Sequence, residues 1–234
     1  MAWTEHLYVD ADALATALAA RLEAIVRDAL AERGQAVLAL AGGRTPFPAY
    51  RVLAARDLDW SRVVLMPTDE RCVTHDHPAC NLREMRNAFA QAEGVRFASL
   101  TAEDGDPDRS EAQARAMLSR HAVDFDAVVL GMGNDAHTAS LFPGAVNLAA
   151  ALDPQGAQDA CRINPQPLPP EAPFPRITLT AARLLRARSL HLAITGEGKH
   201  AVLREAQASR DVSRHPIAAI LHAPGADVHI HWSE

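Results

Sequence analysis

The chain has 234 residues, 48% of them hydrophobic and 22% charged, and its formal net charge is −6 at pH 7. This composition is that of a soluble globular protein, and the negative charge argues against a dedicated nucleic-acid surface. No apolar run approaches the roughly 20 residues of a membrane span, and the N-terminus lacks the pattern of a signal peptide. The 3 cysteines are too few for a disulfide framework or a thiolate zinc cluster, so we expect a cytoplasmic protein with reduced thiols.

The first predicted element is a long amphipathic helix over Asp10–Arg33. Its apolar residues recur at three- and four-residue spacing, and Gly34 is a typical C-terminal stop. Short apolar runs then alternate with helix-like segments. The runs predict strands at Val37–Ala41, Val63–Met66, Ala127–Leu130, Leu190–Thr195 and Ile217–Leu221, and the segments predict helices at Ala79–Ala92, Arg109–Arg120 and Lys199–Ala206. Such alternation indicates an α/β fold with a doubly wound, mostly parallel sheet and helices on both faces, which is a Rossmann-like arrangement.

Two further patterns lie in the C-terminal part of the chain. Val228–Trp232 alternates apolar and polar residues, which predicts a half-exposed edge strand, of the kind found in antiparallel pairs, with its histidines pointing to solvent. Asn164–Pro175 contains six prolines and is expected to be an ordered surface loop. No repeat or linker interrupts the chain, so we predict one domain over residues 1–234. We interpret the remaining C-terminal histidines as structural or surface residues: His191, His215, His222, His229 and His231.

Polar residues directly follow the predicted strand Ala127–Leu130. Gly131 and Gly133 let the backbone turn sharply, and Asn134-Asp-Ala-His137 then lies where open α/β sheets bind their ligands. His137 is the first candidate for catalysis, because a neutral imidazole can act as a base near pH 7. Asp135 could orient the imidazole, bind substrate, or cap a helix expected to start near Ala136.

The predicted strand Val37–Ala41 ends in a potential anion site. Gly42 and Gly43 free backbone N–H groups, and Thr45 precedes a proline that suits the first turn of a helix. Backbone amides, a helix N-terminus and a hydroxyl can together bind a phosphate. The amides could equally stabilise an oxyanion, and Arg44 could add a contact to the anion or face solvent.

Charged side chains also follow the other predicted strands. Asp69, Glu70 and Arg71 stand in a row after one of them, and we interpret Glu70 as a solvated loop residue with local ion pairs. Arg71 offers a planar fork that suits phosphate or carboxylate. Arg176 and Lys199 each place a further cation near the carboxyl edge of the sheet.

The sequence contains one stretch that invites a metal interpretation, His75-Asp-His77. No other ligand cluster has matching spacing, so we predict neither a metal site nor a cofactor.

In this order, these segments resemble the motifs of the 6-phosphogluconolactonase family. The matching stretches are Gly42-Gly-Arg-Thr-Pro46, Thr68-Asp-Glu-Arg71 with Asn81 after it, Leu130-Gly-Met-Gly-Asn-Asp-Ala-His-Thr-Ala-Ser-Leu-Phe-Pro143, Arg176-Ile-Thr178 and Thr195-Gly-Glu-Gly-Lys199. The resemblance covers most of the chain and implies the sugar-phosphate isomerase type of fold. Related glucosamine-6-phosphate deaminases typically continue with Ala-Phe-Asn-Glu, whereas Ala139-Ser-Leu-Phe-Pro143 is similar to the lactonases.

Some positions depart from the family pattern. Arg44 stands where the family commonly has serine, Ala136 where it has glycine, Thr74 where it often has proline, and Cys80 where it often has serine. If the backbone at Ala136 needs a positive φ, alanine costs on the order of 1 kcal/mol there and could move His137.

The resemblance implies hydrolysis of 6-phospho-D-glucono-1,5-lactone to 6-phospho-D-gluconate, in the oxidative pentose phosphate pathway. His137 would activate water, and Asp135 would orient it or bind the sugar. Asp69 would contact sugar hydroxyls or His137. The phosphate would be held by cations assisted by the Thr45 hydroxyl: Arg71, Arg176 and Lys199. A covalent serine mechanism is disfavoured, because the sequence has no Gly-x-Ser-x-Gly elbow and Ser140 falls in an expected helix.

Two alternatives remain. One is a deaminase-like sugar-phosphate isomerase, against which the residues after His137 argue. The other is a non-catalytic sugar-phosphate sensor, although the chain begins almost at once with its first predicted helix and leaves no room for a DNA-binding module. The expected partner is a small sugar phosphate, without nucleic acid or membrane, and the protein is expected to be a monomer or a small homo-oligomer.

Overall fold

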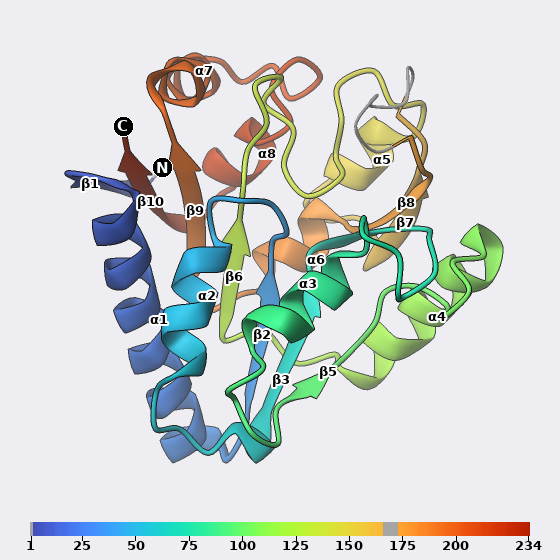
Figure 1. Cartoon of the computed structure of the whole chain (residues 1–234). Helices are drawn as coiled ribbons and strands as arrows, with labels where there is room; N and C mark the ends of the chain where they lie inside the picture. The colour runs from blue at the N-terminus through green and yellow to red at the C-terminus, as the bar shows by residue number, and fades with distance from the viewer. Residues whose placement is uncertain (1, 166–172) are drawn as a thin grey trace.

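The computed structural model describes residues 2–165 and 173–234, and it is built around a parallel sheet (Figure 1). The 7 strands of this sheet are, in spatial order, β1 (Ala2–Tyr8), β10 (Asp227–Ser233), β9 (Leu190–Thr195), β6 (Ala127–Leu130), β2 (Ala36–Leu40), β3 (Val63–Pro67) and β5 (Arg96–Phe97). Every neighbouring pair among them is parallel. A smaller antiparallel sheet has the order β4 (Asp69–Arg71), β8 (Arg176–Leu179), β7 (Ala160–Ile163).

Helices connect the strands. They are α1 (Ala11–Arg33), α2 (Phe47–Ala54), the short 3-10 helix η1 (Trp60–Arg62), α3 (Asn81–Ala88), α4 (Pro107–Arg120), α5 (Leu148–Leu152), α6 (Ala181–Leu185), α7 (Glu197–Ala208) and α8 (Ala218–Leu221). The long helix α1 ends as predicted, because Gly34 adopts a φ of 75° and its N–H donates to the Leu30 carbonyl. At the other end the Asp10 side chain accepts from the Ala13 N–H. None of the described helices combines the length and apolar character that a membrane span requires.

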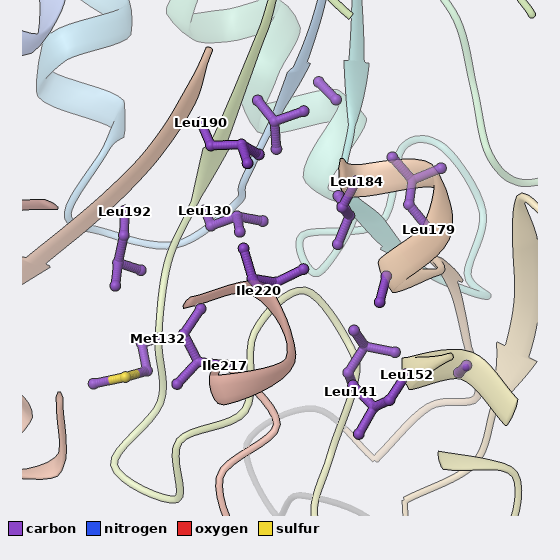
Figure 2. Packing of buried hydrophobic residues seen from close by; sticks show 14 of the residues in the cluster. Leu130, Met132, Leu141, Leu152, Leu179, Leu184, Leu190, Leu192, Ile217 and Ile220 are labelled. Carbon is purple, nitrogen blue, oxygen red and sulfur yellow. The ribbon is translucent and has the colours of Figure 1, made fainter. Parts of the chain in front are cut away.

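The parallel sheet is buried on both faces. Successive strand residues point to opposite faces, so Leu38 and Leu40 pack in one core with α1, α2 and α3, while Val37 and Ala39 belong to the other core. Figure 2 shows part of this second core, in which Leu130 of β6 lies near residues of β9 and α8. Burial on both faces explains the near-continuous apolar runs of the sequence and confirms the predicted doubly wound sheet.

The first element of the chain is a strand, which the sequence analysis did not predict. β1 pairs in parallel with β10, with Glu5 beside Ile230. Neither face of β1 is fully buried, since Thr4 on one face and Glu5 and Leu7 on the other are exposed. A strand this polar has no recognisable buried run.

The prediction of a half-exposed edge strand at Val228–Trp232 is wrong. β10 is parallel and lies inside the sheet, between β1 and β9, close to the two chain ends in Figure 1. Its polar face is covered, so His231 is 3% exposed and His191 of β9 is fully buried. Apolar–polar alternation shows which residues share a face of a strand, but it does not show what covers that face.

The predicted strand at Ile217–Leu221 is also wrong, because this run forms α8. Ile217, Ala218, Ile220 and Leu221 are all fully buried, and Figure 2 shows Ile217 and Ile220 in the second core. A short run that is apolar all round fits a buried helical turn as well as a buried strand. The predicted proline-rich loop falls largely on residues 166–172, outside the described residues.

Candidate active site

The sheet topology creates a crevice at the carboxyl ends of β2 and β6. The chain proceeds from β2 to β3 on one side, whereas β6 pairs with β2 on the other side. Neighbouring strands whose connections leave in opposite directions open a ligand site at this edge. A cleft of about 670 Å³ lies here, a size that suits a small-molecule ligand. The structure brings all the predicted site residues into its lining: Gly42, Gly43, Arg44, Thr45, Asp69, Arg71, Asp135, His137, Arg176 and Lys199.

His137 and Asp135 form a hydrogen-bonded pair in the cleft. Nδ1 of the imidazole lies 2.5 Å from an Asp135 carboxylate oxygen, which also accepts from the His137 backbone N–H at 3.2 Å. Partial burial raises the pKa of Asp135, but the hydrogen bonds and charge of His137 outweigh it and leave that pKa below its usual value. Because an ionised Asp135 accepts a hydrogen bond from Nδ1–H, Nε2 carries the lone pair and can act as a base.

The alternative role of Asp135 as a helix cap is wrong. Residues 131–147, all described, form turns and extended segments, and the next helix begins at Leu148. Short polar residues after a strand are typical of a helix start, but residues 133–137 instead form a tight turn closed by backbone hydrogen bonds. The N–H of Ala136 donates to the Gly133 carbonyl, and the N–H of Gly133 donates to the His137 carbonyl.

The backbone around the pair is tightly constrained. A Cβ on Gly133 would lie 2.2 Å from Nδ1 of His137, so only glycine leaves room for the pair. Ala136 has a φ of 62°, which confirms the positive φ considered from the sequence. Its methyl group is fully buried in the second core, and burial of that carbon offsets a strain on the order of 1 kcal/mol.

Asp69 is the first residue of β4, two residues after the end of β3. It is 8% exposed, and its Oδ2 accepts from the Ser140 hydroxyl at 2.5 Å. Ser140 is fully buried and lies in a turn, so its expected placement in a helix is wrong. The segment after His137 therefore reaches across to Asp69.

Glu70 is not a solvated loop residue, which corrects the interpretation from sequence. It is fully buried, and its carboxylate accepts from the backbone N–H groups of Arg71, Asn81 and Leu82 at 2.7–2.8 Å and from the Cys80 thiol. Burial raises the pKa of Glu70 to about 7, while the three N–H donors act in the opposite direction. Glu70 thus joins β4 to the start of α3. Three charges in a row do not reveal which of them points inward.

Replacing Glu70 by glutamine should destabilise the fold by about 1–3 kcal/mol, because the new amide NH2 would face buried donors and leave one unpaired. Urea unfolding at pH 8 measures this change. The matched control is Glu84→Gln, on the surface-facing part of α3, where the side chain only accepts at 3.5 Å from Asn87. Equal unfolding free energies for wild type and Glu70→Gln would show that the four donors do not require a carboxylate.

Arg71 and Arg176 form a cationic wall on the small sheet. They are direct partners in the register of β4 and β8. Nη1 of Arg71 donates to the Ala79 carbonyl at 2.8 Å and to the Asn81 side chain at 3.0 Å. Its Nε is buried and has no hydrogen-bond partner among the described residues. A ligand oxygen would satisfy this donor.

Arg176 is linked to His137 through an aromatic ring. The Arg176 guanidinium lies 5.0 Å from the centre of the Phe142 ring, and that ring stacks on the His137 imidazole at 4.2 Å. Arg176 is 3% exposed, and its Nη1 donates to the Phe174 carbonyl. The ring therefore fixes one face of the imidazole while Asp135 fixes Nδ1.

The Gly42–Thr45 loop and α7 supply the other cations. The pKa of Lys199 is lowered by partial burial and by the nearby positive charge of Arg44. Gly43 has a φ of 92°, as a glycine loop that turns around a ligand requires. The Thr45 hydroxyl lies 3.2 Å from that of Thr195, at the end of β9. The positive charges of Lys199 and Arg44, held close together, favour binding of a multivalent anion.

Asn81 and Phe142 are among the lining residues that were not predicted as site residues. A Cβ on Gly42 would lie 2.3 Å from Oδ1 of Asn81, so the glycine loop packs directly against this amide. Phe142 contacts both His137 and Arg176, as described above. Both residues stand in the family motifs, but neither has a charge or spacing that indicates its contacts.

Among residues 2–165 and 173–234, no group of three or more His, Cys, Asp or Glu side chains is placed to hold a metal ion. A second cavity, of about 450 Å³, lies near η1 and is lined by residues 54–61, Gln91 and Glu93. It contains none of the predicted site residues.

Comparison with known proteins identifies the family of the chain. The model of the family "Glucosamine-6-phosphate isomerases/6-phosphogluconolactonase" matches residues 9–232. The 6-phosphogluconolactonase of Pseudomonas aeruginosa is 39% identical over 220 residues, covering 93% of this chain and 90% of its own, and that of Rhizobium meliloti is 36% identical over 230 residues, covering 97% of both. The crystal structure of a 6-phosphogluconolactonase from Shewanella baltica superposes with a TM-score of 0.91 at 33% identity, covering 99% of this chain and 97% of the other. The chain therefore belongs to the glucosamine-6-phosphate isomerase/6-phosphogluconolactonase family.

Proposed function

We propose that this protein hydrolyses 6-phospho-D-glucono-1,5-lactone to 6-phospho-D-gluconate, the second step of the oxidative pentose phosphate pathway. One observation carries the proposal: an Asp135–His137 pair with an available Nε2 faces a cleft lined by arginine and lysine side chains. A base beside several cations suits an electrophilic substrate that also carries a phosphate.

In the proposed mechanism, Nε2 of His137 takes a proton from water as the water oxygen attacks the lactone carbonyl carbon. Backbone N–H groups of Gly42 and Gly43 are candidate donors to the developing oxyanion or to the phosphate. When the bond from the carbonyl carbon to the ring oxygen breaks, the protonated imidazole returns its proton to that oxygen. The ionised Asp135 stabilises the transient imidazolium.

Arg71, Arg176 and Lys199 hold the phosphate in this proposal, and the Thr45 hydroxyl assists them. The buried, unpartnered Nε of Arg71 and the repulsion between Lys199 and Arg44 both support an anion at this place. Asp69 accepts hydrogen bonds from the sugar hydroxyls. Since the three cysteines are buried and free, a reducing cytoplasm is the compartment we propose.

A serine nucleophile does not fit the geometry. Ser140 is fully buried, and its hydroxyl proton is directed at Asp69 rather than at a histidine. Water is therefore the proposed nucleophile, and pre-steady-state traces should show no burst of product.

The alternative activity is deamination of glucosamine 6-phosphate, which relatives of the same family suggest. Two assays on one preparation separate the activities. Acid release from freshly generated 6-phosphogluconolactone should exceed the spontaneous rate, and ammonia release from glucosamine 6-phosphate should remain at background. Ammonia release without lactone hydrolysis would favour the isomerase class, and binding of either sugar without turnover would favour a sensor.

Replacing Arg176 by alanine should lower kcat/KM for the phosphorylated lactone by about 10- to 100-fold, the value of one charge-assisted contact. The same variant should change kcat/KM for plain gluconolactone far less, because that substrate has no phosphate. Arg162→Ala, on the adjacent strand β7 and outside the cleft, is the matched control. Equal losses on the two substrates would remove Arg176 from the phosphate site.

A further inference from the structure

We infer that Ser140 is a positioning residue that holds the Asp69 carboxylate in its working orientation, an inference that rests on the proposed function. The hydroxyl of Ser140 donates to Oδ2 of Asp69 at 2.5 Å, and both residues are buried. Such a bond to a carboxylate is charge-assisted and strongly directional. Ser140 borders the cleft but is fully buried, and its hydroxyl proton is engaged by Asp69, so the proposed action on the substrate is through Asp69.

The position of Ser140 is fixed from several sides. Its backbone N–H donates to the Thr178 hydroxyl at 3.2 Å, and Thr178 is the register partner of Asp69 across β4 and β8. The next residue, Leu141, is fully buried, and Figure 2 shows it in the second core. Ala139, just before, has a φ of 47°, so the chain turns sharply to bring the hydroxyl toward Asp69.

Asp69 depends on this contact. Among the described residues, its second oxygen, Oδ1, accepts only a long bond of 3.4 Å, from the Thr68 hydroxyl. Within the described part of the chain, Ser140 therefore supplies the shortest hydrogen bond to the carboxylate. Without it, the carboxylate would be freer to rotate about the Cβ–Cγ bond.

The contact also joins two walls of the site. Ser140 follows His137 by three residues in the loop after β6, whereas Asp69 follows β3. A hydrogen bond between them sets the separation between the proposed base and the carboxylate that receives the sugar. A misplacement of about 1 Å in such a site can lower the rate about 10²-fold.

The test is a double-mutant cycle on kcat/KM for 6-phosphogluconolactone, with wild type, Ser140→Ala, Asp69→Asn and the double variant. Ser140→Ala should lower kcat/KM about tenfold or more in the wild-type background, as loss of a charge-assisted bond predicts. In the Asp69→Asn background the same change should cost less than about twofold, because the carboxylate that Ser140 orients is gone. A merely structural role would give equal losses in both backgrounds.

Two further variants keep the cycle interpretable. Ser140→Cys retains a side chain of similar shape but a weak donor, so it should lose activity like Ser140→Ala even if the alanine variant folds poorly. Ser110→Ala removes another fully buried serine, whose hydroxyl accepts from the Ala102 N–H outside the cleft, and should leave kcat/KM unchanged.

The outcomes separate the inference from the proposed function. A wild-type protein without turnover of the lactone would overturn the function and the inference with it. An active wild type with equal losses in both backgrounds, or with full activity in Ser140→Cys, would overturn only the role of Ser140.

Discussion

The His137→Ala variant should turn over 6-phosphogluconolactone about 10²–10⁴-fold more slowly than wild type, the usual range for loss of a general base. The structure gives a reason for this size. Asp135 holds Nδ1 at 2.5 Å and Phe142 stacks on the imidazole face, so the ring presents Nε2 in one fixed orientation. Alanine removes the base and leaves water to attack without proton transfer.

The measurement is kcat at pH 7.5 in a pH-stat, corrected for spontaneous hydrolysis. His121→Ala is the control, because His121 lies at the end of α4 and does not line the cleft. Circular dichroism verifies that both variants are folded. A folded His137→Ala protein with wild-type kcat would exclude His137 as the base.

The second large effect concerns low pH. The free energy of unfolding should fall by about 5 kcal/mol between pH 6.5 and 4.5, because two histidines that are buried as neutral rings bind protons in the unfolded chain. His191 and His231 lie on neighbouring strands beneath α1. Nδ1 of His191 is 3.0 Å from Nε2 of His231, and the other nitrogens face the Ser189 and Tyr8 hydroxyls. In this series of hydrogen bonds, every nitrogen of the two rings has a partner when both imidazoles are neutral.

Burial first, and then the charges of neighbouring histidines and Arg21, lower the pKa of His191 to about 2 and that of His231 to about 3. In the unfolded chain both rings titrate near 6.5. The stability that their neutrality provides is therefore full above pH 6.5 and is lost as the pH falls toward 3. Each histidine accounts for about 1.4 kcal/mol per pH unit in this window.

Other groups titrate in the same range, so the test compares wild type with His191→Gln. Glu70, whose raised pKa of about 7 makes stability decrease as the pH rises from about 4.5 to 7, is present in both proteins. So are His6, Asp227 and His229, which surround the pair. Urea unfolding at pH 8, 6.5, 5.5 and 4.5 should show a slope below pH 6.5 that is smaller by about 1.4 kcal/mol per unit in the variant. Identical slopes would show that His191 is not kept neutral by folding.

Some elements of the fold could be predicted from the sequence with their bounds. The strands at Ala127–Leu130 and Leu190–Thr195 have the predicted limits, because parallel strands covered on both faces are apolar at nearly every position. The helix over Asp10–Arg33 has a capping aspartate and a stop glycine. The antiparallel strands β4, β7 and β8 are only three or four residues long and mixed in polarity, and even the alternation in β8 is too short to identify a strand.

The candidate site was predictable to the extent that strand ends share one edge of a parallel sheet. That rule brings His137, Arg71 and Lys199 to one cleft, although their roles stay predictions. Glu70 and Ser140 could not be recognised, because their importance depends on partners that only the folded chain brings within hydrogen-bond distance. The extent of the domain over residues 1–234 also stays a prediction.

We propose that the cleft hydrolyses the phosphorylated lactone selectively because its cations bind the phosphate. The most direct test compares wild-type kcat/KM for 6-phosphogluconolactone with that for unphosphorylated gluconolactone, both corrected for spontaneous hydrolysis. Three charge-assisted contacts predict a preference of about 10³-fold or more for the phosphorylated substrate. Equal values for the two lactones, or no acceleration of either above the spontaneous rate, would contradict the account.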